Sequence, residues 1–397
     1  MAQQLHPYSQ RLPWSSSPNR LSQCLAEKRA AGNTFLDLTI SNPTQALADY
    51  PHTEIAAAYA SIDNFNYHPQ PFGDLPAQEA VVSYYAEKGV AVAENQIALT
   101  ASTSEAYSLL FKLLCDPGDE ILTPIPSYPL FEHLAALESV RTVPYHLHYA
   151  GDWYVDLHDL QNAITPRTRA IVVVNPSNPA GCYSKEHEAM ALLNIAAQHR
   201  MPVIVDEVFF DYPIPQGRSL PPSYCRYHQT LIFVLNGLSK LAGMPQMKLG
   251  WIVLNGPQKE QAGARRRLEL ILDTYLSVAT PIQKAARPLF QIGSNIHAQL
   301  HERIISNLRT TAAILRGSPL TCLNVEGGWS AVLQLPDVLA EEEWVLRLLN
   351  ESSVVVQPGY FFDMPADPCI VISLITPPEI FEHGITEILS FVSKVLK

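Results

Sequence analysis

Short apolar runs alternate with helical stretches through the middle of the chain. Between residues 97 and 255, six strand-length runs are rich in β-branched and aliphatic residues, at 97–100, 120–123, 170–175, 203–206, 231–235 and 249–254. This alternation predicts a mainly parallel sheet with helices on both faces. We therefore expect an α/β fold in this part of the chain.

The pattern changes after Gly256. A helical stretch over 258–275, a break at 277–281 and a helix to about residue 316 are followed by short strands near 322–325, 331–335, 354–356 and 370–374, with helices at 340–349 and from 378. This indicates a separate, smaller α+β unit. One hydrophobic core stops growing at roughly 250 to 300 residues. For a chain of 397 residues we expect a large domain, 46–290, and a small domain formed by 1–45 and 291–397.

Composition and charge narrow the class of protein. Hydrophobic residues make up 47% and charged residues 16%, which is typical of a globular protein. The net charge of −11 disfavours nucleic acid as a partner.

The N-terminus lacks the apolar core of a signal peptide, and the longest apolar runs are far shorter than the roughly 20 residues that span a bilayer. The six cysteines form no C-x-x-C pair, so we expect reduced thiols, no metal site and a cytoplasmic protein.

Polar residues end several of the predicted strands, namely Thr100, Asn175, Asp206 and Asn236. In sheets of this kind, ligands bind at the carboxyl ends of the strands. We therefore expect the chemistry at this edge.

The stretch Asn236-Gly237-Leu238-Ser239-Lys240 directly follows the run 231–235. A lysine in a dry cleft at a strand end has a lowered pKa, and its neutral amine can form a Schiff base. The alternative is a surface lysine in a loop.

The acidic pair Asp206-Glu207 stands at the end of the run 203–206. A carboxylate here could hold the protonated ring nitrogen of a pyridine cofactor, or act as a metal ligand or a helix cap.

Two further stretches could bind a ligand. Asn175-Pro176-Ser177-Asn178-Pro179 offers an amide that could reach a ring oxygen, or is simply a proline-rich turn. Ser102-Thr103-Ser104-Glu105 begins an apolar-periodic helix with a capping-box pattern, which can bind an anion or serve as a plain N-cap. The chain contains neither a G-x-G-x-x-G nor a Walker sequence, so a fold that binds NAD or a nucleoside triphosphate loses its main support.

Eight motifs occur in order along nearly the whole chain: Tyr67-x-Pro69 with Gly73, residues 100–106, 116–120, Pro126-Ser127-Tyr128-Pro129, 175–181, Asp206-Glu207, Ser239-Lys240 and Gln357-Pro358-Gly359. Together they resemble the fold-type I pyridoxal 5′-phosphate (PLP) enzymes, specifically the class I/II aminotransferases. The resemblance implies a PLP-dependent aminotransferase that moves an amino group between an amino donor and a 2-oxo acid. It also implies a large domain with a mainly parallel sheet flanked by helices and a smaller α+β domain.

The resemblance also implies roles for individual residues. Lys240 would form the Schiff base with PLP and move the proton. Asp206 would pair with the pyridinium nitrogen, and Asn178, before a peptide bond to Pro179 that can be cis, would bond the ring's phenolic oxygen. Tyr128 would stack on the ring. The phosphate would be held by a set of polar residues: Thr103, Ser104, Ser239 and Lys248, with Tyr67 reaching it from the partner subunit of a homodimer.

Three positions depart from the family pattern. Phe209 replaces the usual tyrosine that bonds the ring oxygen, which predicts a shifted spectroscopic titration. Lys248 replaces the arginine on the phosphate and keeps its charge without the bidentate fork. Val371 stands where the family clamps the substrate carboxylate with arginine, and no Lys or Arg occurs between Arg347 and Lys394.

The missing clamp leaves two accounts of substrate binding. In one account, another cation replaces the arginine. The nearest concentration of positive charge is Arg265-Arg266-Arg267, and the alternative interpretation of this triplet is a solvated helix face. In the other, the substrate lacks the α-carboxylate, or neutral donors such as Ser41, Asn42 and Trp329 receive it. A PLP-dependent lyase acting by β-elimination or decarboxylation, and a non-catalytic PLP-binding sensor, are the alternative functions.

Overall fold

The computed structural model describes residues 8–12, 18–47, 49–60, 66–215, 221–365 and 367–397. Its largest feature is an eight-stranded sheet in the order β2-β9-β8-β7-β6-β3-β4-β5. The strands are β2 (Ile97–Thr100), β3 (Glu120–Ile125), β4 (Arg141–Tyr149), β5 (Trp153–Val155), β6 (Thr168–Val174), β7 (Val203–Asp206), β8 (Ile232–Gly237) and β9 (Gly250–Asn255). All six predicted strands are present, and the prediction of a mainly parallel α/β sheet is confirmed.

Strand direction explains where the sheet departs from a purely parallel one. The five strands from β8 to β4 run parallel, whereas β9 is antiparallel to β8 and β2, and β5 is antiparallel to β4. The prediction missed β4 and β5. β4 carries Pro144 and alternates buried with exposed positions, so it lacks the continuous apolar run that marks the central strands.

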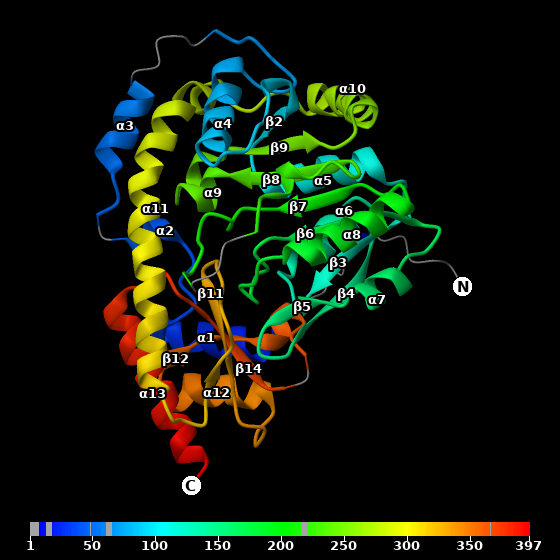
Figure 1. Cartoon of the computed structure of the whole chain (residues 1–397). Helices are drawn as coiled ribbons and strands as arrows, with labels where there is room; N and C mark the ends of the chain where they lie inside the picture. The colour runs from blue at the N-terminus through cyan, green and yellow to red at the C-terminus, as the bar shows by residue number, and fades with distance from the viewer. Residues whose placement is uncertain (1–7, 13–17, 48, 61–65, 216–220, 366) are drawn as a thin grey trace.

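Helices cover both faces of this sheet (Figure 1). Alternate residues of the strands belong to two apolar clusters: one contains α5 (Thr103–Leu114), α6 (Leu130–Leu137) and α10 (Gln258–Tyr275), and the other contains α4 (Leu75–Glu87), α8 (Glu186–Gln198) and α11 (Thr280–Ile314). Because successive strand residues point to opposite faces, one short apolar run supplies both clusters. The short helix α7 (Leu157–Asn162) lies beside β4.

A second, four-stranded antiparallel sheet has the order β10-β11-β14-β13. Its strands are β10 (Thr321–Cys322), β11 (Ser330–Gln334), β13 (Gln357–Pro358) and β14 (Cys369–Ser373), with α12 (Glu341–Glu351) and α13 (Pro378–Val395) beside it. β1 (Leu36–Asp37) pairs with β12 (Val354–Val355), and α1 (Arg20–Ala30) packs on α12. The N-terminal segment therefore joins the C-terminal part of the chain, as Figure 1 shows.

The long helix α11 runs alongside both parts of the molecule (Figure 1). Sequence analysis placed a break at 277–281, but α11 already begins at Thr280. Pro281 occupies the first turn, where a missing N–H costs no helical hydrogen bond. The predicted helix over 258–275 is confirmed as α10, which ends before Leu276 at a φ of 69°. α2 (Pro43–Ala46) and α3 (His52–Ala60) lead from the N-terminal segment towards α4.

The segment before β11 is bound to two loops of the large sheet. The amides of Glu326 and Gly327 both donate to the carbonyl of Gly181, at 2.7 and 2.9 Å, and Gly328 donates to the carbonyl of Tyr212 at 3.0 Å. A side chain at Gly327 would meet the ring of Tyr183 at 2.6 Å, so this close approach requires glycine. These bonds fix the position of Trp329 and Ser330 over the edge of the large sheet.

Candidate active site

Polar strand ends meet at one edge of the large sheet, as predicted. Val174 and Leu235 are the register partners that flank Asp206 on β7. Gly250 of β9 pairs with both Gly237 and Thr100. The loops that leave β2, β6, β7 and β8 therefore start side by side.

Lys240 lies in α9 (Leu238–Leu241), the short helix that follows β8. Its Nζ is 4.9 Å from the ring centroid of Trp329 and 5.5 Å from that of Phe209. Burial lowers the pKa of the Lys240 amine, and the charge of Asp206 opposes this effect. The Tyr212 hydroxyl donates to the Lys240 carbonyl at 2.7 Å. Lys240 is thus an amine held between aromatic rings, and the alternative of a surface loop lysine is wrong.

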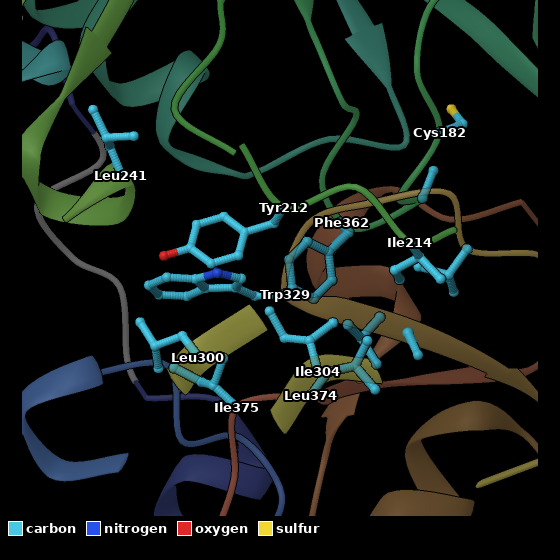
Figure 2. Packing of buried hydrophobic residues seen from close by; sticks show 14 of the residues in the cluster. Cys182, Tyr212, Ile214, Leu241, Leu300, Ile304, Trp329, Phe362, Leu374 and Ile375 are labelled. Atoms are coloured by element: carbon cyan, nitrogen blue, oxygen red, sulfur yellow. The ribbon is translucent and has the colours of Figure 1, made fainter. Parts of the chain in front are cut away.

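The aromatic side chains beside Lys240 form a packed group. Trp329 is edge-on to both Phe209 and Tyr212, each with ring centroids 5.3 Å apart. In Figure 2, Tyr212 lies above Trp329, and Leu300 and Ile375 of the apolar cluster lie below Trp329. This group covers the amine on the side of the second sheet and limits the access of water.

The acidic pair at the end of β7 divides between two environments. The Asp206 carboxylate accepts from the Val208 amide at 3.1 Å and from the Tyr107 hydroxyl at 3.2 Å. Burial raises the pKa of Asp206 to about 6, while those two bonds and the charge of Lys240 lower it. Glu207 instead accepts from Ser223 and from the Tyr224 amide, and burial raises its pKa to about 7. Asp206 is therefore the acid of the pair whose charge interacts with Lys240.

Asn178 lies in the loop after β6, and its peptide bond to Pro179 is cis, as the sequence allowed. The Ser330 hydroxyl donates to the Asn178 Oδ1 at 3.1 Å. Because this bond engages the amide oxygen, the Nδ2 group remains as a donor for a ligand oxygen. The loop is thus oriented by a strand of the other sheet.

Two of the residues predicted to bind phosphate, Thr103 and Ser104, begin α5, and Ser239 lies in α9. Ser102 caps the helix by accepting from the Glu105 amide at 3.1 Å, and Glu105 accepts from Ala101 at 2.5 Å, one residue earlier than in a capping box. Thr103 and Ser104 are the first residues of this 12-residue helix, whose N-terminus favours an anion. A side chain on Gly250 would lie 3.2 Å from the carbonyl carbon of Ser102, so the segment that carries Lys248 comes close to this helix.

Two predicted tyrosines are less tightly held. Tyr128 follows β3 and the cis Ile125–Pro126 bond, and half of its side chain is exposed. Tyr67 is 64% exposed, and within the described ranges no contact joins it to Lys240, Asp206 or Asn178. Tyr67 therefore does not belong to the site within a single chain.

Val371, at the position where the family carries the substrate-binding arginine, lies in the small sheet. Val371 pairs with Val332, and Ser373 pairs with Ser330, so all four residues lie on one face of the small sheet. This is the face from which Ser330 reaches Asn178. An arginine at 371 would therefore be on the face nearest the site, whereas valine offers no charge there.

Among the described residues, no contact joins Ser41, Asn42 or the arginine triplet to Lys240, Asp206 or Asn178. Asn42 caps α2 by accepting from the Thr44 amide, and Ser41 is exposed. Arg265 lies over the ring of Phe72 at 3.7 Å and donates to the Asn95 carbonyl, while Arg266 and Arg267 are exposed on α10. Within the chain, the arginine triplet thus has other contacts, and Trp329 is the one of these candidates that contacts Lys240.

Two kinds of feature are absent from the described part of the chain. No group of three or more His, Cys, Asp or Glu side chains there could hold a metal ion. No helix there is long and apolar enough to cross a membrane.

The model of the family "Aminotransferase class I and II" matches residues 33–386. The chain belongs to this family. It is 32% identical to the glutamate–pyruvate aminotransferase AlaA of Escherichia coli over 347 residues, which cover 84% of each protein. It is 25% identical to the alanine aminotransferase of Mycobacterium tuberculosis over 357 residues, 87% of this chain and 82% of the relative.

Solved structures of aminotransferases have the same fold. The alanine aminotransferase from Pyrococcus furiosus superposes with a TM-score of 0.85 and 26% identity, over 94% of this chain and 96% of that one. The tyrosine aminotransferase from Leishmania infantum superposes with a TM-score of 0.81 at 20% identity, over 96% and 98% of the two chains. The class I/II aminotransferase is thus a PLP-dependent enzyme of fold type I, and the predictions of fold, enzyme class and cofactor are confirmed.

The residues of this aminotransferase fit PLP. The buried Asp206 carboxylate has a protein donor on each oxygen, and no cation of the described residues is in contact with it, so a protonated ring nitrogen would supply the missing charge. The free Nδ2 donor of Asn178 and the N-terminus of α5 match the ring oxygen and the phosphate of the same cofactor.

Four residues of this arrangement escaped the sequence analysis: Tyr107, Tyr212, Gly250 and Ser330. Tyr107 lies on the apolar face of its helix, so the sequence pattern indicates only a core residue. Ser330 is an ordinary strand residue until the two sheets are placed together. Gly250, which follows Lys248 by two residues at the start of a strand, carried a usable signal, because glycine at such a place indicates a close backbone approach.

Proposed function

We propose that Lys240 is the catalytic residue of this aminotransferase and that it carries PLP covalently. The observation that supports this most strongly is the Lys240 amine itself, enclosed by Phe209 and Trp329 and lowered in pKa by burial. A neutral amine is the form that attacks a carbonyl and that accepts a proton. Lys240 would hold that proton beside the substrate's α carbon and deliver it to the cofactor's C4′ carbon.

The other site residues hold and orient the cofactor. Bound PLP supplies an electron-withdrawing ring that stabilises the negative charge left when the substrate's α proton departs. Asp206 keeps the ring nitrogen protonated, and Asn178 donates to the phenolic oxygen. Tyr128 covers the ring face. The phosphate is received by the N-terminus of α5 and nearby side chains: Thr103, Ser104, Ser239 and Lys248.

We infer that the substrates are an amino acid and a 2-oxo acid. The relatives named glutamate–pyruvate and alanine aminotransferase support alanine, glutamate and their 2-oxo acids as the first compounds to test. Because Val371 offers no charge, the carboxylate is received by neutral donors. Trp329, beside Lys240, is placed best, and Ser41 and Asn42 are the other candidates. A neutral set binds a carboxylate more weakly than arginine does, so we expect a high KM.

We also propose a homodimer in which Tyr67 reaches the phosphate of the partner subunit. Tyr67, Tyr275 and Leu276 are large apolar side chains with 56 to 65% exposure. Their two segments are in contact, because the Ser277 hydroxyl bonds both the amide and the carbonyl of Gln70 at 2.9 Å. Exposed large apolar side chains on two segments in contact favour association with another copy.

Two further predictions remain proposals. The division into a large domain, 46–290, and a small domain, 1–45 with 291–397, is supported by the two separate sheets. A cytoplasmic location is supported by the six cysteines, all of which are free thiols.

The test uses Lys240→Ala with Lys259→Ala as the matched control, since Lys259 is an exposed lysine on α10. Both proteins and the wild type are loaded with PLP, reduced with borohydride and digested for peptide mass analysis. We expect the pyridoxyl mass on the peptide that contains Lys240 in the wild type and in Lys259→Ala, with no adduct and no turnover in Lys240→Ala. An adduct on a different lysine would overturn the assignment.

A further inference from the structure

The hydroxyl of Tyr107 contacts the acid that faces the cofactor. Tyr107 lies on α5, four residues after Thr103, and donates to the Asp206 Oδ2 at 3.2 Å. Both residues are buried, with exposed fractions of 2% for Tyr107 and 9% for Asp206. The helix whose N-terminus faces the phosphate thus also reaches the carboxylate proposed for the ring nitrogen.

Packing fixes the Tyr107 ring. Its centroid lies 5.1 Å from that of Phe131, edge-on, and 5.9 Å from that of Phe111 on the same helix. Burial, followed by the charge of Asp206, raises the pKa of the Tyr107 hydroxyl well above its usual value. The hydroxyl therefore keeps its proton and can only donate to the carboxylate.

The carboxylate has one protein donor on each oxygen. Val208 donates to Oδ1 from the backbone, and Tyr107 is the side chain that donates to Oδ2. A donor to the ionised form of a buried acid favours ionisation. We propose that Tyr107 is a positioning residue of this aminotransferase, which holds Asp206 ionised and aligned for the ring nitrogen of PLP. This inference rests on the proposed role of Asp206.

The expected effect of Tyr107→Phe depends on pH. Burial already raises the pKa of Asp206 to about 6, and loss of one donor raises it by about one further unit. The titratable groups that act on Asp206 are Tyr107 and Lys240, and Lys240 is unchanged in the variant. Near pH 8 the carboxylate stays ionised in both proteins, whereas near pH 5.5 the ionised fraction of Asp206 is about eightfold smaller in the variant than in the wild type.

The probe is pyridoxine 5′-phosphate, because it has the ring nitrogen and the phosphate but no aldehyde that can bond to Lys240. Its dissociation constant is measured on the cofactor-free protein from pH 5.5 to 8. We expect Tyr107→Phe to bind within about twofold of the wild type at pH 8 and about eightfold more weakly at pH 5.5, in proportion to the ionised fraction of Asp206. An equal loss at every pH, or no loss at any, would contradict the proposal.

Two further variants make the outcome specific. Tyr145→Phe removes an equally buried hydroxyl, which donates to the Val172 carbonyl at 2.8 Å, and should leave the pH dependence unchanged. In an Asp206→Asn background, Tyr107→Phe should add no pH-dependent loss, and such a loss there would overturn the inference. If Asp206→Asn alone binds the probe as the wild type does, the proposed role of Asp206 fails. If Asp206→Asn weakens binding but Tyr107→Phe does not, the role of Tyr107 alone fails.

Discussion

The Ser330 hydroxyl donates a hydrogen bond of 3.1 Å to the Asn178 amide oxygen, across a separation of 152 residues in the chain. Ser330 begins a strand of the small sheet, and Asn178 lies in a loop of the large sheet. The bond therefore connects the face that carries Val371 with a residue proposed to hold the cofactor. It orients the amide without the charge that an arginine would bring.

The first prediction concerns this bond. Ser330→Ala leaves the Asn178 amide free to rotate and removes about 0.5–1.5 kcal/mol of interaction. We expect the visible absorption titration of the PLP-loaded protein to move and its PLP affinity to fall a few-fold. Ser330→Thr keeps the hydroxyl and should behave as the wild type. Identical titrations of the alanine variant and the wild type would show that the bond does not position Asn178.

A second prediction concerns Phe209, where the family usually carries tyrosine. Phe209→Tyr adds a donor beside Lys240, which favours the ionised phenolic oxygen of the cofactor. The absorption titration of the loaded protein should therefore move to lower pH, by about one unit for one hydrogen bond. Phe210→Tyr, at the next position, serves as the control. A shift to higher pH, or an equal shift in the control, would mean that residue 209 does not face that oxygen.

The sequence predicts the large sheet well because its central strands are buried on both faces. Runs such as Val203–Asp206 are apolar at every position up to the acid, so burial and function are visible together. Lys240, Asp206 and Asn178 follow such runs directly, and the ordered motifs identify them. Tyr107 and Ser330 carry no local signal, because their importance depends on packing between distant elements. Strand β4, which lies between β3 and the short edge strand β5, was missed because its outward residues are polar and one is proline.

The third prediction follows from the buried acid that the proposed chemistry does not use. Burial raises the pKa of Glu207 to about 7 from the 4.5 of an ordinary glutamic acid. The fold thus favours the protonated form, so the contribution of Glu207 to stability is complete below pH 4.5 and is lost as the pH rises through about 7.

Glu207→Gln removes this pH dependence. Between pH 8 and pH 5, the unfolding free energy of the wild type should increase relative to the variant by about 2–3 kcal/mol. Urea unfolding of the cofactor-free proteins at both pH values measures the difference. Glu302→Gln, at an exposed position of α11, should show none. A parallel pH dependence of wild type and Glu207→Gln would show that Glu207 titrates normally.

The fourth prediction concerns the close approach of β8 and β9 at Gly237 and Gly250, next to the segments that carry Ser239 and Lys248. A side chain on Gly237 would lie 2.9 Å from both the Gly250 Cα and the Leu249 carbonyl oxygen. Gly237→Ala must therefore separate β8 from β9, at a cost of about 1–3 kcal/mol, and displace Ser239 and Lys248. We expect weaker binding of pyridoxine 5′-phosphate.

Gly263→Ala provides the control for this variant. Gly263 lies within α10, and an added side chain there meets only the flexible end of Arg267 at 3.4 Å. Alanine favours the helix by up to about 1 kcal/mol, so stability should rise and binding should not change. Unaltered binding in Gly237→Ala would show that the two strands do not position the phosphate site.

The central claim is that this chain transfers an amino group through a lysine-bound cofactor. The most direct measurement adds L-alanine or L-glutamate to the PLP-loaded protein without any acceptor and follows the visible spectrum and the released 2-oxo acid. The account predicts that the band of the PLP form is replaced by the band of the pyridoxamine form, and that one molecule of 2-oxo acid is released per site. Added pyruvate should then restore the band of the PLP form. Continuous release of 2-oxo acid beyond one per site would instead show elimination. A band that no amino acid alters would contradict the claim.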